Sequence, residues 1–411
     1  MQAEIITIGD EILSGKTVDT NSTFIAGQLM LIGVEPKYMS TISDDKAAII
    51  NTLEMALSRT SLVIITGGLG PTHDDITKHT LAQYFDRKLV RDDQLLDRLK
   101  AYFDSRGRVL DPLNYTQADF PENTLKLFND RGTATGMGFE RDGKWVFSMP
   151  GVPSEMMHMM SDQVLSVIKN NYSLDAYKIK DIQTIGISEA KLATALNDLN
   201  LDKMNQLKFA YLPKLGRVTL RIYYKSNFDN KTLEAVIDQI KLRVGDYIYS
   251  TQGNDIAQVI GNIMSEKNLK LSLAESCTGG YLGHLITSVS GSSMYFEGGV
   301  IAYSNKVKEQ HLGVNKATIS EFGAVSQEVA KEMANGVRDK FNTDIGIAIS
   351  GVAGPQGGTK DKPVGTICFA LSSKHKTISR RYQFYKVRHM NIELSAITAL
   401  RLLWEEFLKD F

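Results

Sequence analysis

The order of apolar and polar positions divides the first 173 residues into two kinds of segment. Uninterrupted apolar runs at 5–8 and 62–65 predict buried strands. After them, apolar residues recur every three or four positions, which predicts helices. These stripes are Phe24, Ile25, Leu29 and Ile32; Ile49, Ile50, Leu53 and Leu57; and Met156, Met160, Val164 and Ile168. Because strands that are apolar throughout need cover on both faces, we expect an α/β domain with a parallel sheet over 1–173.

The pattern changes over residues 174–252, where short strands and helices follow in the order β-α-β-β-α-β. A helix opened by Ser188 and two strands about Gly216 belong to this order. The order predicts a small ferredoxin-like α+β module. Its basic residues suit RNA or DNA binding as well as a solvated face, and we favour the solvated face.

A third segment, which we place at 253–411, follows the polar stretch TQGND. Helices are predicted at 256–264, at 325–341 and at the end of the chain; strands are predicted at 269–274, 300–305, 344–351, 363–371 and 378–386. Glycine-rich turns follow several of these strands. The segment is therefore again predicted to be α/β.

In the first segment, Asp142-Gly143 predicts a two-residue hairpin.

Composition narrows the class of protein without naming a function. Lys and Arg together number 47, as do Asp and Glu, so no overall field favours direct nucleic-acid or anionic-membrane binding. Cys277 and Cys368 are the two cysteines, and they form no C-x-x-C, which excludes a disulfide framework and a thiolate zinc site. We find neither a signal-peptide pattern nor a run of about 18 apolar residues. We therefore expect a soluble, cytoplasmic protein.

The stretch TIGDEILSGKT, residues 7–17, resembles a phosphate-binding P-loop. That motif needs four residues between its first glycine and Gly-Lys-Ser/Thr, but five residues separate Gly9 from Gly15. Asp10 and Glu11 would also repel phosphate unless a cation lies between them. We interpret the stretch as an acidic loop that is compatible with a metal ion.

Several carboxylates of the first segment fall at or near predicted loops: Asp10, Glu11, Asp19, Asp44, Asp74 and Asp75. Each taken singly suits a cap or turn. With the glycine loop TGGLGPT they suggest metal-assisted attack on a diphosphate. No H-E-x-x-H or Cys/His cluster occurs, so the metal would meet oxygen ligands and be magnesium-like.

In the third segment, AESCTGG at 274–280 places a carboxylate, two hydroxyls and a thiol where a strand meets a helix. Ser276 or Thr278 could simply cap that helix. Alternatively Ser276 is a nucleophile with a lysine base, and Lys308 with Tyr303 follows the next predicted strand. Cys277 is the rival nucleophile, because a helix start favours its thiolate. The turn SGVAGP at 350–355 could converge on the same pocket.

These motifs together resemble one family. TIGDEILSGKTVDTN, TGGLGPTHDD and MPGVPSE resemble the N-terminal domain of the CinA (competence/damage-inducible) proteins, which is similar to molybdopterin-binding domains. AESCTGG, GGVIAYSNKVK and ISGVAGP resemble the C-terminal nicotinamide-nucleotide amidase domain of that family. Six motifs in order cover essentially the whole chain.

The resemblance implies a hydrolase that converts nicotinamide mononucleotide to nicotinate mononucleotide and ammonia, without a cofactor. By this similarity Ser276 is the nucleophile, and Lys308 and Tyr303 support proton transfer. The residues implied as further catalytic or substrate-binding groups are Glu275, Thr278, Gly279, Gly280, Ser350, Gly351, Gly354 and Arg388. Arg388 is expected to hold the substrate phosphate.

For the N-terminal domain the resemblance implies cleavage of ADP-ribose to AMP and ribose 5-phosphate. The expected cofactors are a divalent metal of the Mg, Mn or Co type and potassium. The implied ligands are Asp10, Glu11, Asp44 and Asp75 for the metal, and Asn21, Gly67, Gly68, Gly70 and Thr72 for the substrate. Leu69 and Asp74 depart from the molybdopterin-binding pattern, which favours a metal site over pterin binding.

The family also implies a homodimer and leaves two alternatives open. The N-terminal domain could be a non-catalytic pterin- or nucleotide-binding and dimerisation module. The protein could otherwise serve as a competence or recombination accessory that acts through a recombinase partner, because the balanced charge argues against direct DNA binding.

Overall fold

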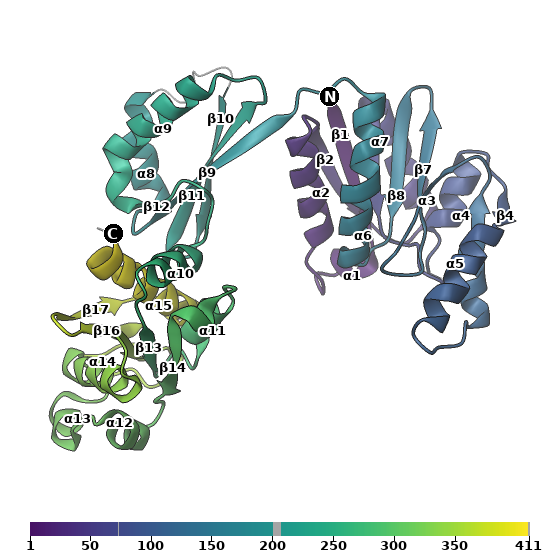
Figure 1. Cartoon of the computed structure of the whole chain (residues 1–411). Helices are drawn as coiled ribbons and strands as arrows, with labels where there is room; N and C mark the ends of the chain where they lie inside the picture. The colour runs from purple at the N-terminus through teal and green to yellow at the C-terminus, as the bar shows by residue number, and fades with distance from the viewer. Residues whose placement is uncertain (73, 200–206, 410–411) are drawn as a thin grey trace. The chain divides into compact units, whose positions relative to one another are not determined.

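The computed structural model describes residues 1–72, 74–199 and 207–409 (Figure 1). The chain divides into two compact units. The first comprises Met1–Lys178 with Tyr224–Asn227, and the second comprises Ile179–Tyr223 with Phe228–Phe411. No helix in the described part of the chain is long and apolar enough to cross a bilayer.

The main sheet of the first unit has the strand order β2-β1-β3-β8-β7-β6. Its strands are β1 (Gln2–Ile8), β2 (Glu35–Ile42), β3 (Leu62–Thr66), β6 (Leu125–Leu127), β7 (Gly136–Arg141) and β8 (Lys144–Met149). Strands β2, β1, β3 and β8 are parallel, but β7 and β6 are antiparallel to their neighbours. The prediction of a parallel sheet is therefore wrong at this edge, and the sheet is mixed. The predicted hairpin causes the reversal, since Asp142 and Gly143 both have positive φ.

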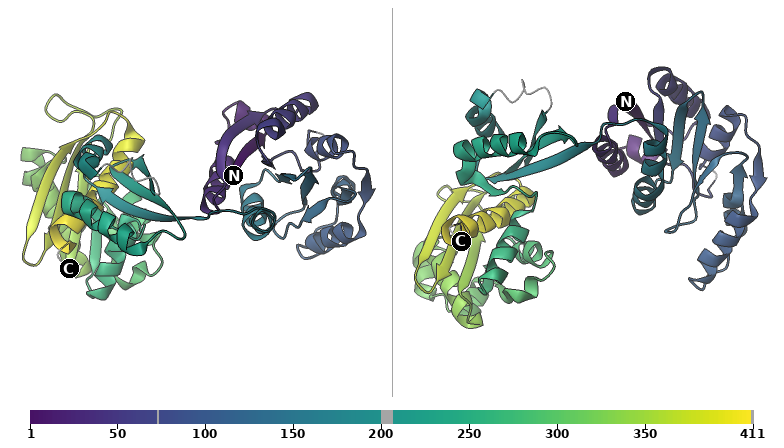
Figure 2. Two further views of the ribbon diagram at one scale, coloured as in Figure 1. Left: turned by 90° about the horizontal axis from the view of Figure 1, so that it is seen from above. Right: turned by 45° about the horizontal axis from the view of Figure 1, so that its top comes forward.

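Helices cover both faces of this sheet (Figure 2). On one face lie α2 (Thr20–Leu31), α6 (Pro153–Met159) and α7 (Leu165–Asn171); on the other lie α3 (Lys46–Arg59), α4 (Thr77–Tyr84) and α5 (Asp93–Asp104). Successive strand residues serve opposite faces, so Ile5 packs in the first layer and Ile6 in the second. Met156 and Met160 are fully buried, which confirms the methionine stripe as core.

Shorter elements complete the first unit. The acidic loop forms α1 (Asp10–Leu13), and a small antiparallel pair is made by β4 (Leu89–Arg91) and β5 (Asp119–Pro121). A 3-10 helix, η1 (Pro112–Ala118), leads into β5. A π-helical turn, η2 (Met160–Val164), joins α6 to α7.

The middle module begins the second unit. Its elements are β9 (Tyr177–Ile185), α8 (Glu189–Leu196), β10 (Leu207–Lys214), β11 (Arg217–Lys225), α9 (Asn230–Val244) and β12 (Ile248–Ser250). Ser188 caps α8 as predicted. The strand order β10-β11-β9-β12 places the third strand between the first and second, as the predicted β-α-β-β-α-β arrangement requires. The order of elements is thus confirmed.

The second sheet of this unit has the order β14-β13-β15-β16-β17. Its strands are β13 (Leu271–Glu275), β14 (Phe296–Ile301), β15 (Ile345–Gly351), β16 (Thr366–Ser373) and β17 (Thr377–Gln383). The first three are parallel, and β16 and β17 are antiparallel. The carboxyl ends of β13, β14 and β15 therefore share one edge, where a ligand is expected in such sheets.

The predicted strand at 300–305 is wrong in its bounds. Strand β14 ends at Ile301, and Ser304 instead caps α12 (Asn305–Leu312) by accepting the backbone N–H of Val307. Two glycines at 298 and 299 lie within the strand, and glycine disfavours strands, so the apolar pattern hides where the strand starts. Lys308 therefore lies on α12, which begins a few residues after the end of β14.

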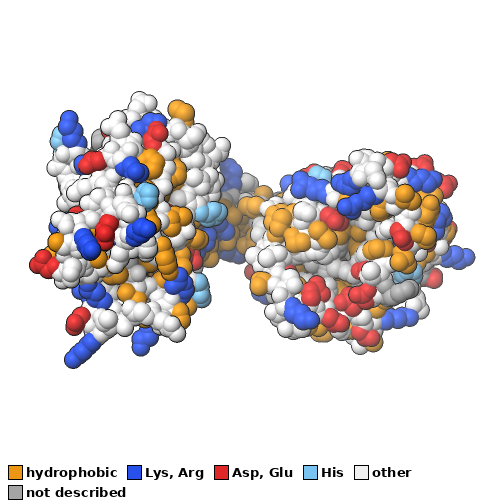
Figure 3. All heavy atoms as spheres, turned by 90° about the horizontal axis from the view of Figure 1, so that it is seen from below, with side chains coloured by type: hydrophobic (Ala, Val, Ile, Leu, Met, Phe, Trp, Pro, Cys, Tyr) orange, Lys and Arg blue, Asp and Glu red, His pale blue; other side chains and the backbone are white. Residues whose placement is uncertain are grey.

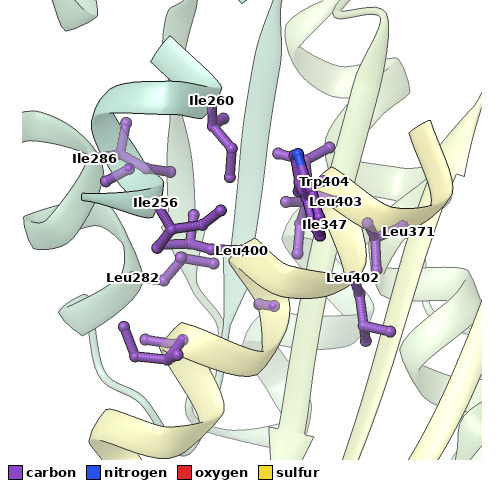
Figure 4. Close-up of a cluster of buried hydrophobic side chains, with 14 of the residues drawn as sticks. Ile256, Ile260, Leu282, Ile286, Ile347, Leu371, Leu400, Leu402, Leu403 and Trp404 are labelled. Carbon is purple, nitrogen blue, oxygen red and sulfur yellow. The ribbon is translucent and has the colours of Figure 1, made fainter. Parts of the chain in front are cut away.

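This sheet also has helices on both faces. One layer contains α10 (Ile256–Glu266), α11 (Tyr281–Thr287) and α15 (Arg388–Leu403), and the other α12, α13 (Lys316–Phe322) and α14 (Gln327–Phe341). Figure 4 shows how Ile256, Ile260, Leu282 and Leu400 meet over Ile347 of β15. The opposite layer uses small residues such as Ala274 and Ala348, which brings α14 close to the sheet. Both ends of the strands are thereby held rigidly.

Candidate active site

Two predicted residues of the C-terminal domain lie in direct contact. Ser276 follows the last residue of β13, and its backbone N–H donates to the carbonyl of Ile349 on β15 at 2.9 Å. Helix α12 carries Lys308 to the same place, so that Lys308 Nζ lies 3.1 Å from Ser276 Oγ. Ser276 is 8% exposed and Lys308 is 1% exposed. A hydroxyl and an amine are thus joined at the sheet edge, largely away from water.

Lys308 is buried among oxygen acceptors, and its burial makes the charged amine less favourable than it is in water. Burial lowers the pKa of Lys308 below its ordinary value of 10.5. Its Nζ donates to the carbonyl of Ala302 at 2.7 Å and contacts the carbonyl of Tyr303 at 3.4 Å. A neutral amine has two N–H donors, which these two carbonyls can accept. Nζ also donates to Ser276 Oγ at 3.1 Å, and once it has lost a proton its lone pair would face that hydroxyl instead.

Cys277, the rival nucleophile, lies in an apolar setting. Its side chain belongs to the hydrophobic core beside Leu273 and Ile367. Burial raises the pKa of Cys277 to about 12. A thiol in this state carries almost no thiolate at neutral pH. The geometry therefore favours Ser276 between the two.

Glu275 is held by the helix that follows it. One of its oxygens accepts the backbone N–H groups of Gly280 at 3.0 Å and Leu282 at 3.1 Å, and the other accepts that of Gly283 at 2.8 Å. The first turn of α11 is therefore occupied by this carboxylate. Glu275, expected to be catalytic, is thus held by the turn that follows Ser276, and the backbone N–H of Gly280, expected to bind substrate, donates to it.

Thr278 and Gly279 lie in the same turn with different roles. The side-chain Oγ1 of Thr278 is buried and has no hydrogen-bond partner among the described residues. Such a group costs free energy unless a ligand or water satisfies it. Gly279 has φ of +60° and Gly280 has φ of +101°, so the tight turn itself requires these glycines. Thr278 is the member of the turn that offers a side chain to a ligand.

Residues at the end of β15 are packed more tightly than predicted. Ser350 is fully buried, and its hydroxyl donates to the carbonyl of Ala324 at 2.7 Å. The hydroxyl hydrogen of Ser350, a residue expected to bind substrate, is thus already used within the protein. A Cβ at Gly351 would lie 2.3 Å from Ile367 Cδ1, so this glycine serves packing. Gly354 contributes its carbonyl, which accepts Arg388 Nη1 at 2.9 Å.

Arg388 and Tyr303 meet beside the Ser276 turn. Arg388 is the first residue of α15, and its Nη2 donates to Tyr303 Oη at 3.4 Å. Tyr303 is 62% exposed, so the pair faces solvent and can reach a ligand. Asn391, which no sequence motif marks, is fully buried and donates to the carbonyls of Ala353 and Tyr385. Asn391 ties the SGVAGP turn to α15 and so positions Arg388.

The N-terminal unit holds a cavity of about 370 Å³ at the carboxyl ends of its strands. Five carboxylates are among the described residues that line it, and neither lysine nor arginine is: they are Glu11, Asp44, Asp74, Asp75 and Glu155. Figure 3 shows acidic side chains gathered on one face of this unit. Burial first, and then the charges of Asp10, Glu11 and Asp75, raise the pKa of Asp44. Carboxylates in this cavity therefore repel one another.

The predicted metal ligands only partly gather. In the part of the chain that the structure describes, no group of three or more His, Cys, Asp or Glu side chains is arranged to hold a metal ion. Asp10 uses its backbone N–H to donate to Asp44 Oδ2 at 3.2 Å, and Asp75 accepts the N–H of Thr72 at 3.0 Å together with its hydroxyl. The oxygen donors Glu11, Asp44 and Asp75 line one cavity, and such donors suit a magnesium-like ion.

The glycine loop and Asn21 shape the cavity walls. Gly67 has φ of +114°, and a Cβ there would lie 2.1 Å from the carbonyl oxygen of Ile8. Asn21 donates to Thr66 Oγ1 at 3.0 Å and to the carbonyl of Gly151 at 2.8 Å, which joins α2 to two strand ends. It borders a separate cavity of about 80 Å³, and its Oδ1 is buried without a partner among the described residues. Gly68, Gly70 and Leu69 line the larger cavity.

Two further lining residues were not selected from the sequence. Gln117 of η1 is 4% exposed, and both polar atoms of its side chain are buried without a hydrogen-bond partner among the described residues. Glu155 of α6 accepts Asn129 Nδ2 at 2.6 Å, yet burial raises its pKa. Glu155 lies in the MPGVPSE motif and could have been noted there. Nothing in the local pattern around Gln117 marks it.

Comparison with known proteins assigns a family to each part of the chain. Residues 4–170 match the family described as "Probable molybdopterin binding domain", 180–250 the "Damage-inducible protein CinA KH domain", and 253–407 the "CinA C-terminal domain". The predicted ferredoxin-like module is thus KH-like by family.

Relatives that match nearly the whole chain agree with these family matches. A CinA-like protein of Cytophaga hutchinsonii is 41% identical over 98% of this chain and 97% of its own, and one of Salinibacter ruber is 38% identical over 97% and 98%. The crystal structure of the competence/damage inducible protein CihA from Agrobacterium tumefaciens is 32% identical over 36% of this chain and 91% of its own, with a TM-score of 0.35. The length and extent of the similarity show that the chain belongs to the CinA family.

Proposed function

We propose that the C-terminal domain hydrolyses the amide of nicotinamide mononucleotide, giving nicotinate mononucleotide and ammonia. The observation that carries the proposal is the 3.1 Å contact between Lys308 Nζ and Ser276 Oγ in a buried setting. Serine needs a base to become a nucleophile, and burial, which lowers the pKa of Lys308, makes this amine easier to deprotonate for that role. The choice of nicotinamide mononucleotide as substrate rests on the resemblance of the AESCTGG and ISGVAGP loops to the amidase domain of the CinA family.

The reaction follows from these two side chains. Neutral Lys308 accepts the proton of Ser276 as Oγ bonds to the amide carbon, and the charged oxygen that forms is stabilised by the backbone N–H groups after Ser276, those of Cys277 and Thr278. Lys308 then gives the proton to nitrogen as the C–N bond breaks and ammonia leaves. Water attacks the resulting ester and gives a proton to Lys308, which returns it to Ser276 as the acid product leaves.

Arg388 and Thr278 are the residues we assign to substrate binding. Arg388 lies at the start of α15 with its guanidinium near Tyr303, so it offers a charged donor to the single phosphate of the substrate. The unpartnered hydroxyl of Thr278 lies two residues from the nucleophile and would gain a partner on binding. The proposal thus needs no metal in this domain.

The test is ammonia release from nicotinamide mononucleotide by the full chain, with and without EDTA. We expect release that the chelator does not change, because the proposed groups are all side chains and backbone donors. Loss of release on chelation would contradict the mechanism. A complete lack of release by the folded protein would contradict the function itself.

A second function is favoured by the acidic cavity of the N-terminal unit. We propose that this unit cleaves ADP-ribose to AMP and ribose 5-phosphate with a divalent metal, assisted by potassium. Five carboxylates beside a glycine loop would repel a diphosphate unless a cation neutralises them. Glu11, Asp44 and Asp75 line the cavity without forming a ready-made metal site among the described residues, and they are the oxygen donors that the ion would meet there. The ion would supply charge neutralisation and an activated water.

This second proposal has its own test against a pure binding module. AMP release from ADP-ribose should appear on adding Mg²⁺, Mn²⁺ or Co²⁺ to the metal-free protein and disappear with EDTA. A non-catalytic module would bind ADP-ribose without releasing AMP under any of these conditions, which would overturn the proposal.

A further inference from the structure

Gln117 is the most unusual polar residue of the N-terminal cavity. It is 4% exposed, it lines the cavity, and neither Oε1 nor Nε2 has a hydrogen-bond partner among the described residues. Buried amide groups in folded proteins are nearly always paired, because each unpaired group costs about 1–3 kcal/mol. The unpaired acceptor and donor of Gln117 therefore indicate that a ligand in the cavity forms hydrogen bonds with this side chain.

The segment that carries Gln117 is itself well anchored. Asp111 caps η1 by accepting the backbone N–H of Leu113 at 2.9 Å, and the carbonyl of Ala118 accepts the N–H of Asp92 at 2.8 Å. Lys78 Nζ donates to the carbonyl of Thr116 at 2.6 Å. The backbone on both sides of Gln117 is thus paired while its side chain is not. The amide is held at the cavity wall rather than left at a loose end.

The polar groups that line the cavity limit the kind of ligand that fits it. A glutamine amide presents a donor and an acceptor side by side in one plane, which matches a flat ring that carries an amino group beside a ring nitrogen. The other polar side chains around the cavity include Glu11, Asp44 and Glu155, which accept hydrogen bonds when ionised. A neutral, amino-bearing ring suits such walls better than a bare anion does.

We propose that Gln117 recognises the adenine-type edge of the nucleotide in this cavity, an exocyclic amino group beside a ring nitrogen, and so selects adenine over hypoxanthine. This inference rests on the proposed nucleotide function of the N-terminal unit and adds a specificity-determining residue to it. The ring nitrogen concerned is N7, because beside it hypoxanthine carries a carbonyl in place of the amino group and so presents two acceptors, one of which meets the amide oxygen whichever way the amide is turned. The mismatch should then cost affinity.

The experiment measures binding of AMP and of IMP to the full chain by titration calorimetry, with saturating Mg²⁺. We expect the unmodified protein to prefer AMP by about tenfold to hundredfold, which a paired amide contact supplies. Gln117→Leu and Gln117→Met should lose that preference and bind both nucleotides equally. Gln94→Leu, on the exposed side of α5, is the matched control and should keep the preference.

Each outcome decides the inference. Both Gln117 variants remove an unpaired polar group and should unfold at the same temperature as the unmodified protein or above it, which separates misfolding from lost recognition. Equal binding of AMP and IMP by the unmodified protein, no binding of AMP, or an unchanged preference in the variants would overturn it, and the last would mean that water pairs with the amide. If the protein prefers AMP but does not cleave ADP-ribose, the role of Gln117 in recognising adenine stands and only the proposed cleavage activity is rejected.

Discussion

The two candidate sites occupy the same place in two sheets but are built from different side chains, an amine and a hydroxyl in one and carboxylates in the other. Each lies at the carboxyl ends of parallel strands, where such sheets place their ligands. The C-terminal site is built around buried Lys308 and Ser276, which already lie 3.1 Å apart. The N-terminal cavity is lined by carboxylates whose ligand set for a metal is not assembled among the described residues. A shared sheet edge therefore does not determine the chemistry; a few side chains do.

Burial acts on the two sites in opposite directions. It lowers the pKa of Lys308 and raises that of Asp44, because in each case it disfavours the charged form. A neutral lysine is the form that can take a proton from Ser276. A neutral aspartic acid is the form that cannot attract a cation. The first site is thus prepared by its own burial, whereas the second needs an added ion.

The largest effect is expected from replacing the base of the C-terminal site. Lys308→Met keeps the length of the side chain and removes the base, so ammonia release should fall by about 10³-fold, within the usual range for a general base. Thermal unfolding should show that the variant still folds, since a buried amine is replaced by an apolar group. Lys306→Met, on the exposed side of the same helix, is the control. More than a tenth of normal activity in Lys308→Met would remove the base from the mechanism.

A smaller effect is expected on the second site. Asp75→Asn keeps the shape but removes a charge from the cavity, so metal-dependent AMP release should fall about 10²-fold. Ammonia release by the same variant should be unchanged. Both rates are to be measured on one preparation at saturating Mg²⁺. If AMP release survives in Asp75→Asn, the acidic cavity is not the hydrolytic site.

Arg388 should affect binding more than chemistry. Arg388→Lys keeps the charge but loses the paired donors, so the KM for nicotinamide mononucleotide should rise about tenfold with little change in kcat. Nicotinamide riboside, which lacks the phosphate, is the matched probe, and its turnover should not change. An equal loss on both substrates would instead show that Arg388 holds the SGVAGP turn and not the phosphate.

The ammonia-release rate and the Mg²⁺ affinity should each change by up to tenfold per pH unit near the pKa of the group on which they depend. Because Lys308 must be neutral, kcat for ammonia release should rise with pH through its lowered pKa and level off below 10.5. Because Asp44 must be ionised to bind a cation, Mg²⁺ affinity should rise with pH through a pKa above the ordinary 3.8. Rate profiles and metal titrations over the same pH range check both. An ammonia-release profile that is flat across this range would contradict a lysine base.

Much of the fold could be predicted because its strands are short and uninterrupted. The runs at 5–8, 62–65 and 344–351 contain buried strands, since apolar residues dominate each of them. The Asp142-Gly143 hairpin predicted the antiparallel pair β7–β8, but the edge strand β6 was missed. Strand β6 has only three residues, too few to show a period.

The candidate site was less predictable, because side-chain direction at a turn is not encoded in spacing. Glu275, Ser276 and Cys277 are consecutive, yet one binds a helix end, one meets Lys308 and one enters the core. Ser350 is buried for the same reason, its hydroxyl turned to the carbonyl of Ala324. Gln117 lies in a 3-10 helix that carries no periodic pattern, so only the structure brings it to the cavity.

The most direct test of the central claim is ammonia release from nicotinamide mononucleotide by Ser276→Ala beside Cys277→Ala. Burial holds the Cys277 thiol protonated, whereas Ser276 Oγ contacts the base. We predict no release above background from Ser276→Ala and at least half of the normal rate from Cys277→Ala. Activity in Ser276→Ala together with its loss in folded Cys277→Ala would mean that the nucleophile is the thiol and would contradict the account.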